Sequence, residues 1–82
     1  MNKVLRKQGN NTRSKIYDFI VEFITTNGYS PTIMEICRGT GIRSSATVHS
    51  HLDILEQLGL IQTKDFKPRT ISVTGYNFTK GE

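Results

Sequence analysis

The most constraining feature of the sequence is a pair of short helix patterns separated by a tight turn. Thr32 followed three residues later by Glu35 is a capping box, which marks the start of a helix. That helix should cover Ile33–Thr40, and the turn after it begins with a glycine, which readily takes the left-handed conformation at a helix end. Ser44 is the N-cap candidate for a second helix over Ser45–Leu58. Two helices joined this closely are typical of a helix-turn-helix.

An amphipathic pattern upstream predicts a third helix over Arg13–Asn27, with Thr12 as its N-cap and Gly28 as its stop. Its apolar residues recur at helical spacing, at Ile16, Phe19, Ile20, Phe23 and Ile24. The inner faces of the other two helices should complete the core with Ile33, Ile36, Cys37, Val48, Leu52 and Leu55. Gly39 is expected to weaken its helix, because glycine has a low helix propensity.

Two strand patterns follow the helices, at Leu60–Lys64 and Thr70–Val73. A β-hairpin after a third helix is a wing. The predicted fold class is therefore mainly α (α+β), a three-helix winged helix-turn-helix with a C-terminal two-stranded hairpin. We expect one domain over residues 12–73, a flexible basic arm over residues 1–11 and a loose tail over residues 74–82.

The composition limits the classes of function. Lys and Arg number 11 against 7 Asp and Glu in 82 residues, which favours a polyanionic partner. The one cysteine, Cys37, excludes an intrachain disulfide and fits a reducing compartment such as the cytoplasm. No apolar run is long enough to span a bilayer, and no secretory signal is apparent. Motifs for phosphate loops, nucleophilic catalysis or metal clusters are missing, so we expect no enzymatic activity, cofactor, metal or small-molecule ligand.

The exposed face of the Ser45–Leu58 helix predicts where a partner binds. With Val48 at the core, this face is small and neutral at its start, and its acids come only at the far end. Such a helix start suits the major groove and tolerates phosphate. We expect Arg43, Ser44 and Ser45 to hold phosphates, His49 and Ser50 to reach base edges, and Ala46 or Thr47 to touch a thymine methyl. Phosphate or minor-groove contacts are predicted for Lys67 and Arg69 at the wing.

Two other interpretations compete with DNA binding. Three helices and a hairpin also form protein-interaction modules that read no sequence. His49 and His51 suggest a metal site, but side chains two positions apart on a helix point about 200° apart and do not easily share one ion. Packing is the simpler interpretation for His51.

A resemblance to a known family rests on stretches that occur in order. Gly28–Ile36 resembles the GYPPT-x-x-EI stretch in the DNA-binding domain of LexA, the bacterial SOS-response repressor, and Arg43–Leu52 resembles its SSSTVHGHL segment. Leu58–Ile61 and Lys67–Ile71 are similar to its KGLI and KPRAI elements. The match runs over about residues 12–73, and several motifs in order at matching spacing make it specific.

The resemblance implies a winged helix-turn-helix that represses promoters by binding palindromic operators. The family's base-reading positions fall on Ser45, Ala46, Thr47, His49 and Ser50. The SSSTVHGHL segment occurs in one branch of the family. Another branch has Asn and Glu residues among these positions, and Ala46, His49 and Ser50 differ from it, so the operator of that branch should not be assumed for this chain.

LexA proteins also continue into a domain with a Ser–Lys self-cleavage site and the main dimer interface. We expect neither from the residues after Val73, and the chain is interpreted as an excised DNA-binding domain or a stand-alone relative. The expected partners are a palindromic double-stranded operator and a second copy that pairs on DNA, in the bacterial cytoplasm.

Overall fold

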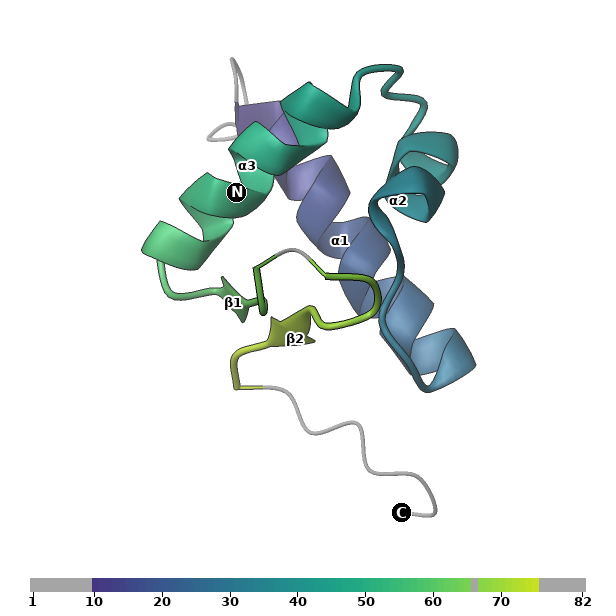
Figure 1. Ribbon diagram of the computed structural model, residues 1–82, viewed down its shortest axis with the longest axis vertical. Helices are drawn as coiled ribbons and strands as arrows, with labels where there is room; N and C mark the ends of the chain where they lie inside the picture. Colours follow the sequence, from purple (N-terminus) through teal and green to yellow (C-terminus); the bar gives the residue numbers. More distant parts are fainter. Residues whose placement is uncertain (1–9, 66, 76–82) are drawn as a thin grey trace, which may run out of the picture.

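The computed structural model describes residues 10–65 and 67–75. Within them the chain forms three helices and a two-stranded antiparallel sheet, in the order α1 (Asn10–Asn27), α2 (Ile33–Thr40), α3 (Ser45–Gln57), β1 (Ile61–Gln62) and β2 (Ser72–Val73). Figure 1 shows α3 crossing α1, with α2 to one side and the hairpin in front of the helices. The predicted three-helix winged helix-turn-helix is confirmed.

Both ends of α2 follow the predicted capping. The backbone N–H of Glu35 donates to the Thr32 hydroxyl at 3.1 Å, and the Thr32 N–H donates to the Glu35 carboxylate at 2.9 Å. These two bonds are the reciprocal pair of a capping box. Gly41 ends the helix at a φ of 80°, a backbone conformation in which residues other than glycine are strained.

The predicted N-cap of α3 is also confirmed. The Ser44 hydroxyl accepts the Thr47 N–H at 3.2 Å, which fixes the start of the helix at the end of the turn. At the other end, the N–H of Gly59 donates to Glu56 and the N–H of Leu60 donates to Leu55. This pair of bonds is a Schellman motif, and it turns the chain from α3 into β1.

The predicted start of α1 at Arg13 was wrong, since the helix already begins at Asn10. Thr12 therefore lies in the first turn and is not the N-cap. The backbone N–H groups of a first turn have no intrahelical acceptor and bond to polar side chains or water instead, so a polar stretch can form the start of a helix. Asn10 and Asn11 belong to the helix rather than to the predicted arm, whose remaining residues, like most of the predicted tail, lie outside the described part of the chain.

The core lies where the three helices meet the hairpin. The three helices bury most of the residues that their patterns predicted, although Phe23 of the predicted stripe is only half-buried. The buried set is Ile16, Ile20, Ile24, Ile36, Val48, Leu52, Leu55, Ile61, Ile71 and Val73. Phe19, Ile33 and Cys37 are half-buried against this core. Because β1 and β2 each place a residue in it, burial of apolar surface ties the hairpin to the helices.

Gly39 has a packing role that the sequence did not reveal. A Cβ atom built on Gly39 would overlap the ring of Phe19 on α1. The missing side chain therefore allows α2 to approach α1 closely at this position.

The hairpin is shorter than predicted. Ile61 pairs with Val73 and Gln62 with Ser72, and the ladder does not continue to Lys64 and Thr70. At that level the Thr70 hydroxyl takes the place of a backbone partner, because it accepts the Lys64 N–H at 3.2 Å. A side chain thus closes the wing loop (residues 63–71) where further ladder bonds were expected.

Candidate nucleic-acid interface

The start of α3 presents small side chains to the solvent. Ser45, Ala46, Thr47 and Ser50 are exposed, whereas Val48 between them is fully buried and anchors the helix to the core. His49 is half-buried, and Arg43 and Ser44 are exposed in the preceding turn. The structure therefore gathers the predicted helix-turn-helix residues around one helix end.

A groove of about 560 Å³ connects this helix end with the wing. Arg43, Ser45 and His49 come to it from the turn and α3, and Lys67 comes from the wing loop. Its other lining residues are mainly apolar. Pro31, Thr32, Ile33, Met34 and Cys37 come from α2 and the segment before it, and Pro68 and Ile71 come from the wing loop. Two cations from separate segments thus share a concave surface beside the exposed start of α3.

The wing loop is held in shape by its own hydrogen bonds. The Lys67 N–H donates to the Lys64 carbonyl at 3.0 Å, and the Thr70 hydroxyl donates to the Lys67 carbonyl at 2.8 Å. Asp65 and Arg69 both have positive φ values, 54° and 57°. Such backbone conformations are uncommon outside glycine, and they persist where the surroundings hold them.

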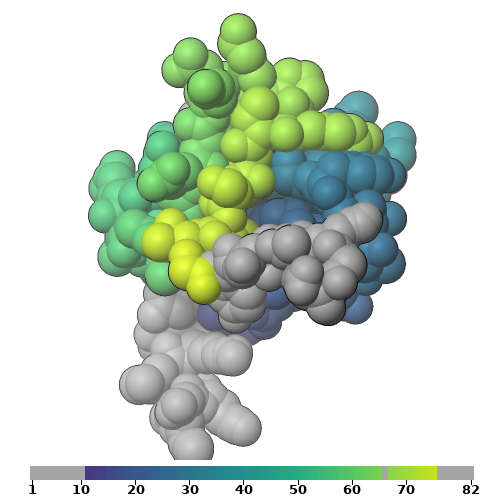
Figure 2. Space-filling view, turned by 90° about the horizontal axis from the view of Figure 1, so that it is seen from below, coloured from purple at the N-terminus to yellow at the C-terminus, as the bar shows by residue number. Residues whose placement is uncertain are grey.

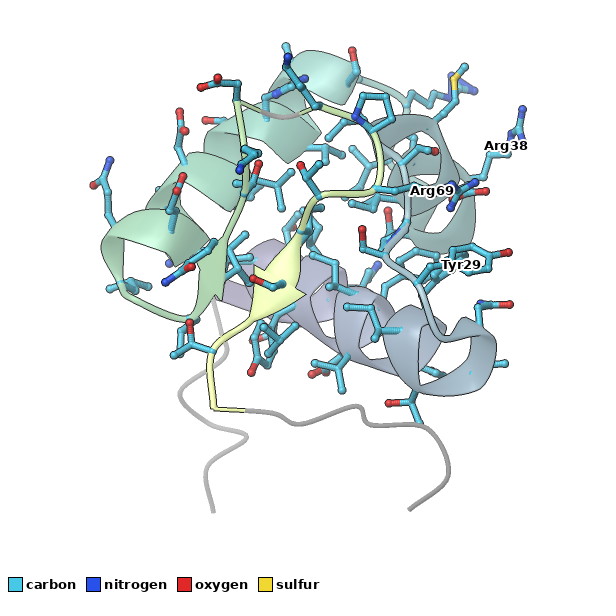
Figure 3. The ribbon with its side chains drawn as sticks, turned by 60° about the horizontal axis from the view of Figure 1, so that its bottom comes forward. Tyr29, Arg38 and Arg69 are labelled. Carbon is cyan, nitrogen blue, oxygen red and sulfur yellow. The ribbon has the colours of Figure 1, made fainter. Side chains whose placement is uncertain are left out.

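Arg69, predicted as a DNA contact, lies among partners within the protein. Its Nη1 and Nη2 atoms each donate to one oxygen of the Glu35 carboxylate at 3.1 Å. Nη1 also donates to the Ser30 carbonyl at 2.9 Å, and the guanidinium lies over the Tyr29 ring, 4.7 Å from its centroid. We call these four residues the clasp. Figure 3 shows Arg69 and Tyr29 close together, while Arg38 projects outward from α2.

The clasp joins parts of the chain that are far apart in sequence. Arg69 and Glu35 are separated by 34 positions, and the Ile71 N–H also donates to the buried Ser30 hydroxyl at 3.3 Å. In the space-filling view, the yellow-green atoms of the wing lie directly against blue atoms of the α1–α2 region (Figure 2). The wing is therefore docked on the segment that starts α2.

The clasp also sets the charge state of its acid. The hydrogen bond from Arg69 and the backbone N–H of Thr32 hold the pKa of the Glu35 carboxyl below its ordinary value. The same hydrogen bond to Glu35 raises the pKa of Arg69. Glu35 therefore stays ionised and paired near neutral pH, and its negative charge is offset beside the groove.

Two other side chains behave as packing residues. Burial, followed by the positive charge of Arg13, lowers the pKa of His51, and its Nδ1 atom has no hydrogen-bond partner among the described residues. Cys37 is half-buried on α2. Over residues 10–65 and 67–75, no three His, Cys, Asp or Glu side chains gather at a spacing that would hold a metal ion. No helix in this part of the chain has the length and apolarity needed to cross a membrane.

Comparison with known families decides the relationship. The family described as the LexA DNA binding domain matches residues 7–70, well over half of the chain. The chain belongs to the LexA DNA-binding domain family. The matched segment contains α2, α3 and the groove residues described above except Ile71, so the resemblance seen in the sequence motifs is confirmed.

The relatives of this LexA-type domain are repressors from clostridia and allied bacteria. The LexA repressor of Clostridium novyi is 49% identical over 59 residues, which cover 72% of this chain and 29% of the relative. That of Acetivibrio thermocellus is 47% identical over 72 residues, 88% of this chain and 32% of the relative. That of Clostridium kluyveri is 44% identical over 69 residues, which cover 84% of this chain and 34% of the relative. The chain thus spans about a third of the length of these relatives.

The clasp is the part of this surface that sequence reasoning missed. Arg69 stood in a basic cluster with Lys64 and Lys67, and nothing local distinguished it from a solvent-facing cation. Glu35 was explained completely by its capping role. The two residues come together only when the wing folds back on α2.

Proposed function

We propose that this domain binds double-stranded DNA sequence-specifically and represses transcription, with the start of α3 in the major groove. The observation that carries the proposal is the exposed, small and neutral start of α3 next to a groove that bears Arg43 and Lys67. A helix fits the major groove, and its N-terminal N–H groups favour a nearby phosphate. Membership of a DNA-binding family and relatives named as repressors support the same function.

Each residue has a proposed role. Arg43, Ser44 and Ser45 contact phosphates, and Lys67 contacts a phosphate from the wing side. His49 and Ser50 donate or accept hydrogen bonds at base edges, while Ala46 and Thr47 lie close enough to sense a thymine methyl. Because Ser44 already accepts a backbone N–H as the cap of α3, its hydroxyl hydrogen remains the group available to a phosphate oxygen.

The proposed DNA partner is a palindromic operator, bound by two copies that pair on it. Two half-sites then lie about one helical turn apart, or a multiple of it, to match the two-fold symmetry. Since the relatives are bacterial, the proposed location is the cytoplasm, on the bacterial chromosome. We assign no catalytic step to these residues.

Selection from a pool of random duplexes, followed by sequencing, tests this proposal. One enriched half-site with a fixed spacing is expected. Ser50→Ala should then relax the preference at one base position by about 1–3 kcal/mol, the usual value of a specific base contact. Lys67→Gln should weaken all duplexes alike and lower the salt slope by about one unit.

Lys15→Gln is the matched control, because Lys15 is an exposed cation on α1 that does not line the groove. It removes the same charge and should change the salt slope less than Lys67→Gln. A pool that shows no enrichment, with wild-type affinity retained for a protein partner alone, would favour the interaction-module interpretation instead.

A further inference from the structure

We propose that Arg69 and Glu35 serve DNA binding as positioning residues: their ion pair holds the wing on α2 so that Lys67 faces the same groove as Arg43 and His49. This inference rests on the proposed function, and it assigns Arg69 a role inside the protein in place of a direct DNA contact. Lys67 remains the wing residue that meets the phosphate.

The guanidinium of Arg69 is held by several contacts at once. Nη1 donates both to the Ser30 carbonyl and to Glu35 Oε1, and Nη2 donates to Glu35 Oε2. The cation also lies over the Tyr29 ring. A guanidinium that faces a carboxylate in this two-point geometry is fixed in orientation as well as in charge. Arg69 is thus directed toward the start of α2.

The backbone of the wing loop connects Arg69 with Lys67. Arg69 has a backbone φ of 57°. A residue other than glycine persists in this conformation where neighbouring contacts hold it there. The neighbouring residue, Thr70, donates its hydroxyl to the Lys67 carbonyl and so connects the clasp to Lys67 through one short bonded path. Releasing Arg69 frees the segment that presents Lys67.

The direction of the change in Kd on removing Glu35 distinguishes a positioning role from a purely electrostatic one. Glu35 is an acid close to a surface that is proposed to meet phosphates. If charge alone mattered, removing this acid would strengthen DNA binding, and a released Arg69 would strengthen it further. If the clasp positions Lys67, removing the same acid weakens binding. The two accounts predict opposite changes in Kd.

Glu35→Gln is the variant that separates them. Glutamine at this position preserves the capping box, because its amide oxygen still accepts the Thr32 N–H. The charge and the ion pair with Arg69 are lost. Glu22→Gln is the matched control, since Glu22 is an exposed acid on α1 whose loss changes the net charge by the same amount.

The experiment titrates a fluorescent duplex, taken from the selection above, at 50 and 200 mM salt. One phosphate contact changes the ratio of the two Kd values by about threefold. Glu35→Gln and Arg69→Gln should each lower this ratio by that factor and raise Kd, as Lys67→Gln does. Lys67→Gln should add little in the Glu35→Gln background, because its contact is already lost. A lower Kd for Glu35→Gln, with a higher Kd for Arg69→Gln, would overturn the proposal and make Arg69 a direct contact.

Amide hydrogen exchange of the wing loop, measured without DNA, keeps this test separate from the proposed function. Exchange at the Lys64 and Lys67 amides, whose hydrogen bonds hold the wing loop, should be faster in Glu35→Gln than in the wild type or in Glu22→Gln. Unchanged exchange rates would refute the proposal that the clasp positions the wing loop, even if the domain binds DNA. A wild type that binds no duplex would instead refute the proposed function, whatever the exchange rates show.

Discussion

Gly39→Ala should destabilise the domain, although helix propensity alone predicts the reverse. Replacing a helical glycine by alanine ordinarily gains about 1 kcal/mol. Here the new Cβ would overlap the Phe19 ring, and overpacking of this kind costs about 1–3 kcal/mol. The expected net loss reaches about 2 kcal/mol. For a domain of this size each kcal/mol shifts Tm by about 4–8 °C, so thermal unfolding followed by circular dichroism resolves the change.

A second background isolates the cause. Phe19→Ala removes the ring, and Gly39→Ala placed on top of it should then raise the unfolding free energy by up to about 1 kcal/mol. The substitution thus reverses its sign between the two backgrounds, which a pure propensity effect cannot do. The same gain in stability from Gly39→Ala in both backgrounds would refute the close approach of α2 to α1.

Three further predictions concern hydrogen bonds and protonation. Ser30→Ala should cost about 1–3 kcal/mol in urea unfolding, because it leaves the buried Ile71 N–H without its acceptor; an unchanged midpoint would contradict that bond. Ser44→Ala should cost about 1 kcal/mol through loss of the N-cap, whereas Ser45→Ala beside it should have little effect; equal losses would argue against the cap. Since burial lowers the pKa of His51 in the folded state, the unfolded state takes up its proton first, and the unfolding free energy should fall as pH drops below about 6.5. His51→Gln should remove that decline, and a decline that persists would assign it to another group.

Local signals account for the parts of the fold that were predicted correctly. The capping box at Thr32, the cap at Ser44 and the stop at Gly41 act within one helical turn, so a short stretch of sequence contains all of the chemistry involved. The apolar stripes are equally local, because a helical period of 3.6 residues dictates which side chains share a face. These two signals were sufficient to locate α2, α3 and the residues at the start of α3.

The features that were missed depend on contacts between distant segments. Gly39 was interpreted as a weak helix residue, since only the packing of α2 on α1 reveals the ring that it accommodates. The ladder ended early because the Thr70 hydroxyl replaced backbone pairing, which a strand propensity does not describe. Arg69 and Glu35 were each explained by a local role, and their pairing required the folded wing.

The salt dependence of binding to a selected duplex tests the central claim most directly. We predict tight binding at low salt, a slope of log Kd against log salt that Lys67→Gln lowers by about one unit, and a base preference that Ser50→Ala relaxes at a single position. Binding that is absent at low salt, or that is equal for every duplex and unaffected by Ser50→Ala, would contradict sequence reading by the start of α3.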